Sequence, residues 1–196
     1  MRIIAGSAKG RKLIVPRGRD IRPTLDRVRE ALFNILGQKL AAKKFLDLFA
    51  GSGVVGIEAL SRGAEVAVLV EKDREACRVI QKNLELCGFS DRARVICRDV
   101  IRALPSLRGE KFNVVFADPP YYQGWEEKIF PLLARYRLVP PGGVVVVESG
   151  KKTVLPDELA GFSLKRREIY GDTSLNFFIW EETGEEIADS SLSREF

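Results

Sequence analysis

The stretch FLDLFAGSGVVG, residues 45–56, decides the fold of this chain. FLDLF is a short apolar run of the kind found in strands that are buried on both faces of a parallel sheet. Gly51, Gly53 and Gly56 follow with the spacing G-x-G-x-x-G, and Glu71 lies twenty residues beyond Gly51. This arrangement is typical of a nucleotide-binding βαβ unit, in which the acid accepts from ribose hydroxyls. The alternative is a tight turn that needs glycine only for packing.

From residue 43 onward, apolar runs alternate with amphipathic segments. The predicted buried strands cover residues 45–49, 66–71, 93–97, 113–118 and 144–149, and the clearest predicted helices cover residues 73–86 and 126–135. Residues 162–170 and 174–180 flank Gly171-Asp172 and predict an antiparallel pair at the sheet edge. The pattern predicts a doubly wound, mostly parallel α/β domain over residues 39–181, followed by an acidic, frayed tail at 182–196.

Residues 1–38 predict a separate basic extension. RIIAG and RKLIV, separated by a turn, indicate a small β-hairpin. Thr24 is the expected N-cap of a helix that ends before Gly37. Residues 1–29 hold nine Lys or Arg against two acids, a net charge of +7, whereas the whole chain has +5 and the remainder therefore −2. Such an arm suits contact with a phosphate backbone, although a merely solvated terminus has the same composition.

The overall composition excludes several kinds of chemistry. The chain has 196 residues, of which 45% are hydrophobic, which is enough for one domain with a real core. No apolar run approaches the roughly 20 residues that span a bilayer, and no signal-peptide core follows the N-terminus, so we expect a cytoplasmic protein without membrane contact. The absence of histidine removes Ser–His and Cys–His nucleophiles. The three cysteines match no zinc spacing, and we expect no metal.

Four acids stand at or just after the ends of predicted strands: Asp47, Glu71, Asp99 and Asp118. Ligands of doubly wound sheets bind at this edge. Asp47, next to the glycines, would oppose the pyrophosphate of NAD but suits a cationic amino group. S-adenosylmethionine carries an ammonium, a ribose diol and an adenine amine, for which Asp47, Glu71 and Asp99 are suitable acceptors. The acids therefore favour this methyl donor.

The stretch FADPPYYQG, residues 116–124, predicts the catalytic loop. Two prolines end the strand and leave Asp118 on a stiff loop. Asp118 and the carbonyl of Pro119 can each accept one N–H of an exocyclic base amine, which steers the nitrogen lone pair toward a methyl sulfonium, and Pro120 holds these acceptors in place. Tyr121 offers a stacking face for a base that is unpaired or flipped out. An isolated motif of this kind would be only a turn.

These motifs together resemble a known family. FLDLFAGSG, Glu71, Asp99 and the tetrad DPPY at residues 118–121 are similar to the class I S-adenosylmethionine-dependent amino-methyltransferases. RIIAGSAKGRKL at residues 2–13 and RPTLDRVREALFNIL at residues 22–36 resemble the bacterial RsmD family, which methylates N2 of a guanine in small-subunit (16S) ribosomal RNA. The similarity runs from Arg2 to about Trp180; Ala5-Gly6 stands where the family often has two glycines.

The resemblance implies a seven-stranded sheet, S-adenosylmethionine as cofactor with S-adenosylhomocysteine as product, and catalysis by Asp118, Pro119, Pro120 and Tyr121. The cofactor site then comprises the residues already argued and their neighbours: Asp47, Gly51, Gly53, Glu71, Lys72, Asp99 and Val100, with Thr24 helping to close it. The implied RNA contacts are Arg11, Lys12, Arg22 and Arg27. The implied substrate is ribosomal RNA in a partly assembled particle, with ribosomal proteins as part of it, and we expect a monomer.

Three alternatives remain open from the residues. A DNA adenine-N6 methyltransferase shares DPPY, but it would usually need a target-recognition domain for which this chain has no room. An NAD-binding oxidoreductase would explain the glycines but not DPPY. An inactive RNA-binding protein on the same fold would have no use for intact acids at Asp47 and Asp118.

Overall fold

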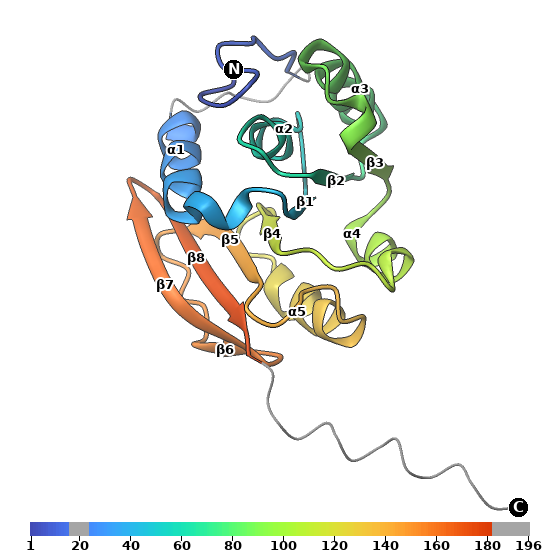
Figure 1. Cartoon of the computed structure of the whole chain (residues 1–196). Coiled ribbons are helices and arrows are strands. Elements are labelled where there is room, and N and C mark those ends of the chain that lie inside the picture. Colours follow the sequence, from blue (N-terminus) through green and yellow to red (C-terminus); the bar gives the residue numbers. More distant parts are fainter. Residues whose placement is uncertain (16–23, 182–196) are drawn as a thin grey trace, which may run out of the picture.

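An eight-stranded sheet forms the body of the protein (Figure 1). The structure, a computed structural model, describes residues 1–15 and 24–181. The strands are β1 (Lys44–Leu48), β2 (Val66–Glu71), β3 (Ala93–Cys97), β4 (Val114–Ala117), β5 (Val144–Gly150), β6 (Glu158–Leu159), β7 (Phe162–Tyr170) and β8 (Thr173–Trp180). Their order in the sheet is β3-β2-β1-β4-β5-β8-β7-β6. β1 to β5 pair in parallel, and β8 pairs antiparallel to both β5 and β7.

Helices cover both faces of this sheet. The α-helices are α1 (Thr24–Leu36), α2 (Val54–Ser61), α3 (Arg74–Cys87), α4 (Val100–Ala103) and α5 (Trp125–Arg135), and the 3-10 turns are η1 (Gly37–Leu40), η2 (Ser90–Arg92) and η3 (Leu104–Leu107). Figure 1 shows α1, α2 and α3 on one side of the sheet and α4 and α5 on the other. The buried side chains form two clusters, one between the sheet and the first three helices, the other between the sheet and α4 and α5. The predicted doubly wound α/β class is confirmed.

Strand periodicity explains how one strand serves both cores. In β1, Phe45 belongs to the cluster under α1, α2 and α3, whereas Leu46 and Leu48 belong to the cluster under α4 and α5. Successive side chains of a strand point to opposite faces. Asp47 therefore shares the face of Phe45, and the amide of Gly56 in α2 donates to its Oδ2 at 2.9 Å.

The strand count differs from the expected seven. The additional strand is β6, a two-residue strand at the sheet edge, where Glu158 and Leu159 pair with β7. So short a segment has no periodicity of its own, and Ala160 and Gly161 with positive φ turn it directly into β7. A very short edge strand limits the unpaired backbone that the sheet exposes.

The predicted N-terminal hairpin is reduced to a single antiparallel bridge between Arg2 and Lys12. Ile3 still exchanges backbone hydrogen bonds with Gly10 and Arg11. The next amide on that side, that of Ala5, donates to the buried carboxylate of Glu58 at 3.0 Å instead of continuing the pairing, and the amide of Ile4 donates to the same carboxylate at 2.8 Å. We call residues 1–15 the N-terminal segment; it is folded against α2 and α3 by side chains of the main domain.

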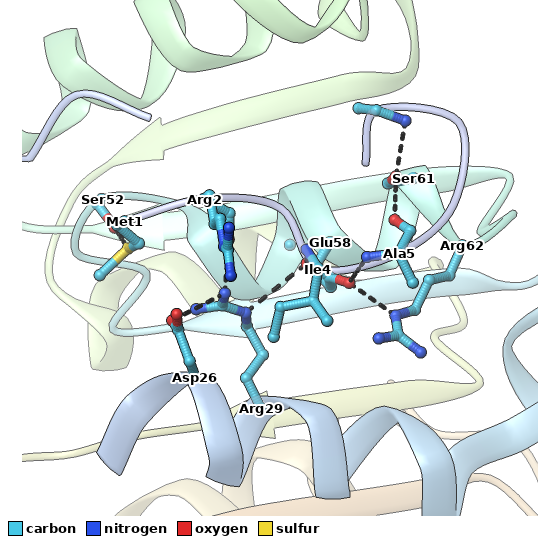
Figure 2. A network of polar contacts seen from close by, with 12 residues as sticks. Met1, Arg2, Ile4, Ala5, Asp26, Arg29, Ser52, Glu58, Ser61 and Arg62 are labelled. Atoms are coloured by element: carbon cyan, nitrogen blue, oxygen red, sulfur yellow. Dashed lines mark hydrogen bonds and ion pairs between the residues drawn. The ribbon is translucent and has the colours of Figure 1, made fainter. Parts of the chain in front are cut away.

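Three buried polar side chains bind the N-terminal segment. Glu58, fully buried in α2, also contacts Arg29 and Arg62, as Figure 2 shows. The Ser61 hydroxyl donates to the carbonyl of Ala5 at 2.6 Å and accepts from the amide of Ala8 at 2.9 Å. On α3, Asn83 bonds both backbone groups of Ile14 and donates to the carbonyl of Ser52 in the glycine turn. Asn83 thus binds both the N-terminal segment and the turn that contains Ser52, between Gly51 and Gly53.

Candidate active site

A cavity of about 730 Å³ opens at the carboxyl edge of the parallel strands. It is lined by Val28, Phe49, Val70, Glu71, Lys72, Asp99, Val100, Asp118, Pro119, Pro120, Tyr121, Trp125, Glu148, Gly171, Asp172 and Thr173. Its size suits a small molecule of cofactor dimensions. The position agrees with the rule that doubly wound sheets bind ligands beyond the carboxyl ends of their strands.

Two predicted cofactor acids line the cavity and are held by backbone donors. Glu71 ends β2 and accepts from the amides of Gly51 and Asp73, at 2.8 and 3.0 Å. Asp99 caps α4 by accepting from the amide of Ile101 at 2.9 Å. A carboxylate has about four acceptor positions, so both side chains keep capacity for hydroxyl or amine donors of a ligand. Their backbone bonds fix where that capacity points.

Asp47, Gly51 and Gly53 are not among the residues that line the cavity. Gly53 has φ +78° and starts α2, and a side chain on it would approach Ile80 and Leu69 within 3.1–3.2 Å. Gly53 is therefore needed for the turn geometry and for close packing. Burial raises the pKa of the Asp47 carboxyl to about 8, against the opposing hydrogen bond from Gly56, with smaller contributions from Asp118 and Glu71. The role of Asp47 as a ligand stays a prediction.

The predicted catalytic loop follows β4 and lines the same cavity. The amide of Asp118 still reaches the carbonyl of Leu48 at 3.5 Å, and the ladder ends there. The Tyr121 hydroxyl donates to Oε1 of Glu148 at 3.3 Å. Burial, followed by the nearby carboxylates of Glu148 and Asp118, raises the pKa of Tyr121 well above its ordinary value. Tyr121 therefore stays a neutral donor, half-buried at the cavity wall.

For the remaining predicted site residues, the structure gives at most a position and no contact that tests their roles. Lys72 and Val100 line the cavity beside the acids they follow. Arg11, Lys12 and Arg27 are exposed, the first two on the N-terminal segment and the third on α1. Thr24 is the first residue of α1, whereas Arg22 lies outside the described residues, as does the predicted tail. The RNA-contact roles and the role of Thr24 stay predictions.

Sequence reasoning missed several cavity residues. Glu148 follows an apolar run in β5 just as the four predicted acids follow theirs, so the signal was present. Thr173 gave no such signal because β8 runs antiparallel, which brings its first residue to the edge where the parallel strands end. Phe49, with φ +63°, packs edge-to-face on Trp125 with ring centroids 5.0 Å apart and forms an apolar wall.

These residues fit S-adenosylmethionine. Acidic acceptors stand at separate strand ends, and apolar side chains line the wall between them. That combination suits a ligand with a positive charge, a sugar diol and a flat aromatic ring. Within residues 1–15 and 24–181, no group of three or more His, Cys, Asp or Glu side chains is arranged to hold a metal ion. Among the helices described, none is long and apolar enough to cross a membrane.

The fold and the cavity define a class I S-adenosylmethionine-dependent methyltransferase. The chain belongs to the family described as "Conserved hypothetical protein 95", which matches residues 1–179, and its resemblance to the RsmD enzymes is confirmed.

Similar proteins cover nearly the whole chain. It is 39% identical over 189 residues to the Escherichia coli K12 protein named ribosomal RNA small subunit methyltransferase D, covering 96% of this chain and 94% of that one. It is 37% identical over 180 residues to Bacillus subtilis YlbH, covering 91% and 98% of the two chains. The solved structure of Escherichia coli yhhF superposes with a TM-score of 0.81 at 38% identity, covering 93% and 99%.

Proposed function

We propose that this enzyme transfers the methyl group of S-adenosylmethionine to the exocyclic N2 amine of a guanine in small-subunit ribosomal RNA. One observation carries the proposal: the loop Asp118–Tyr121 lines the same cavity as Glu71 and Asp99. The acids that we assign to the cofactor and the loop that we assign to the acceptor amine thus line one cavity. The naming of the Escherichia coli relative supports the RNA as substrate.

The chemistry of the acceptor follows from the loop. The lone pair of an exocyclic amine is delocalised into the base, so the nitrogen is a weak nucleophile. When its two N–H groups are accepted by the Asp118 carboxylate and the Pro119 carbonyl, the nitrogen is steered toward tetrahedral geometry, so its lone pair is less delocalised and can point at the methyl group. The bound cofactor supplies an electrophilic methyl group on a sulfonium. Pro120 stiffens the loop, and Tyr121 gives the base a stacking face.

The proposal includes the form of the substrate. The exposed Arg11 and Lys12 on the N-terminal segment, and Arg27 on α1, offer positive charge for the RNA backbone. We propose that the RNA is bound within a partly assembled particle, where ribosomal proteins add to the contact surface, and that the enzyme acts as a monomer. The target base must leave any helix to enter the cavity.

A methyl-transfer assay tests the proposed reaction. Labelled S-adenosylmethionine is offered with small-subunit ribosomal RNA, with the particle that contains it and with double-stranded DNA, and the products are digested to nucleosides. The expected product is N2-methylguanosine, formed faster on the particle than on naked RNA. N6-methyladenine in the DNA, or no transfer despite cofactor binding, would overturn the proposed reaction.

Two cavity carboxylates make a matched pair of variants. Asp118→Ala should lower transfer by more than about 100-fold while the affinity for S-adenosylhomocysteine stays within about tenfold, because its role is at the acceptor amine. Asp99→Ala should weaken that affinity by about 10- to 100-fold, the value of a charge-assisted hydrogen bond. Calorimetric titration and initial rates separate the two effects. Normal turnover of the Asp118 variant would exclude the proposed role of the loop.

A further inference from the structure

Glu148 is a buried carboxylate on the acceptor side of the cavity for which cofactor binding has no use. Its side chain is 6% exposed, and it lines the cavity. β4 and β5 pair in parallel up to Ala117 and Val147. Continuing that register by one residue brings Asp118 and Glu148 to adjacent positions on neighbouring strands. Partners in a parallel pair point to the same face, so the two acids lie side by side at the sheet edge.

The Tyr121 hydroxyl confirms that the two acids face one space. It donates to Oε1 of Glu148 at 3.3 Å, and both Glu148 and Asp118 act electrostatically on it. Thr173, the first residue of β8, also bonds to this hydroxyl. Glu148 therefore stands next to the loop that receives the base, on the side away from Glu71 and Asp99, because β5 lies beyond β4 in the sheet.

A carboxylate at this position distinguishes bases by hydrogen-bond polarity. An ionised carboxylate only accepts hydrogen bonds. On guanine one of the two ring nitrogens beside the exocyclic amine, N1, carries a hydrogen, and the other, N3, carries a lone pair. The ring nitrogen beside the amine of adenine or cytosine carries a lone pair, so only guanine offers an N–H donor next to its amine. A buried carboxylate against a lone pair is left without its hydrogen bond, which costs more than the bond itself is worth.

We propose that Glu148 determines the specificity for guanine by accepting the N1–H of the target base while Asp118 and Pro119 hold its N2 amine. This inference rests on the proposed function. The hydrogen bond also places negative charge next to the ring, which increases electron density on the amine. The other use of Glu148 would be only to orient Tyr121, and the test separates the two.

The test uses 2-aminopurine in place of the target guanine located by the assay above. This base keeps the 2-amino group but presents a lone pair at N1. The two RNAs compete for the enzyme, and the ratio of their kcat/KM values is measured. The wild type should prefer guanine by more than about 100-fold, as expected when a buried acceptor loses its donor. Equal use of both bases by the wild type would overturn the inference without any variant.

Two variants complete the test. Glu148→Gln offers an amide N–H to the lone pair of 2-aminopurine, so the preference for guanine should fall by about 10- to 100-fold. Tyr121→Phe removes the hydroxyl that Glu148 accepts from and should leave the preference unchanged. An unchanged ratio in Glu148→Gln, or the same fall in Tyr121→Phe, would show that Glu148 only orients the tyrosine. If the wild type forms no N2-methylguanosine, the proposed function fails as well; if it does, only the inference is at stake.

Discussion

At the scale of one residue, the buried carboxyl of Asp47 makes the stability of the protein depend on pH. Burial raises its pKa from the ordinary 3.8 to about 8 in the folded state. Below the ordinary pKa, both folded and unfolded chains hold the proton. Between the two values only the folded chain holds it, so the free energy of unfolding falls as the pH rises through this window.

Asp47→Asn removes this titration while keeping an oxygen that can accept from the Gly56 amide. The variant should gain stability relative to the wild type between about pH 5 and about pH 8, on the order of 3 kcal/mol, since one pKa unit corresponds to about 1.4 kcal/mol. Urea unfolding of both proteins across this range measures the difference between their free energies of unfolding. The contributions of the other titrating groups are the same in both proteins and cancel in this difference. A difference that is constant with pH would mean that folded Asp47 ionises near its ordinary pKa.

Gly6 gives a second prediction at this scale, with Gly10 as its matched control. Both have positive φ, +84° and +83°, so both variants to alanine carry the strain of the left-handed region, about 1–2 kcal/mol. A Cβ at Gly6 would also lie 1.9 Å from the carbonyl oxygen of Ser61, whereas at Gly10 it would meet nothing within 4 Å. Gly6→Ala should therefore be less stable than Gly10→Ala by about 2 kcal/mol. Thermal unfolding compares the two, and equal losses would show that the segment moves freely from Ser61.

At the scale of an element, the N-terminal segment is held in a fixed position on the main domain. Its backbone is bound by Glu58, Ser61 and Asn83, which leaves Arg11 and Lys12 exposed on a fixed support. Lysines and arginines on a fixed support lose less freedom when they meet a phosphate backbone than those on a mobile tail. We therefore expect their contribution to RNA binding to be electrostatic and preorganised.

Replacing Arg11 and Lys12 together by Ala should weaken binding to small-subunit RNA. The slope of log K against log salt should fall by about one unit for each phosphate contact that is lost. The matched control replaces Lys43 and Lys44, which are exposed at the start of β1 and thus at the sheet edge opposite the cavity. Fluorescence anisotropy at several salt concentrations gives both slopes. If the two double variants behave alike, the segment does not contact the backbone.

At the scale of the whole molecule, the sequence predicted a parallel sheet covered by helices. This was possible because apolar runs and amphipathic segments alternate along the chain, and that alternation is typical of a doubly wound α/β domain. Five apolar runs became the five parallel strands, and the acids after β2, β3 and β4 reached the cavity as expected. The face of the sheet that Asp47 occupies could be predicted only from the alternation of side chains along β1, which puts Asp47 on the same face as Phe45. Glu148 was missed although its run resembled the others. Thr173 depends on the antiparallel return of β8, which a linear pattern does not encode.

The binding of the N-terminal segment by Glu58 and Asn83 has a consequence for biosynthesis. Synthesis runs from the N-terminal toward the C-terminal side, so residues 1–15 emerge before Glu58 and Asn83 have been made. Until α2 and α3 have formed, the amides of Ile4, Ala5 and Ile14 lack the side-chain acceptors that they have in the folded protein. Residues 1–15 therefore cannot reach their final place until residues 54–87 have followed them, and their basic side chains stay exposed throughout that interval.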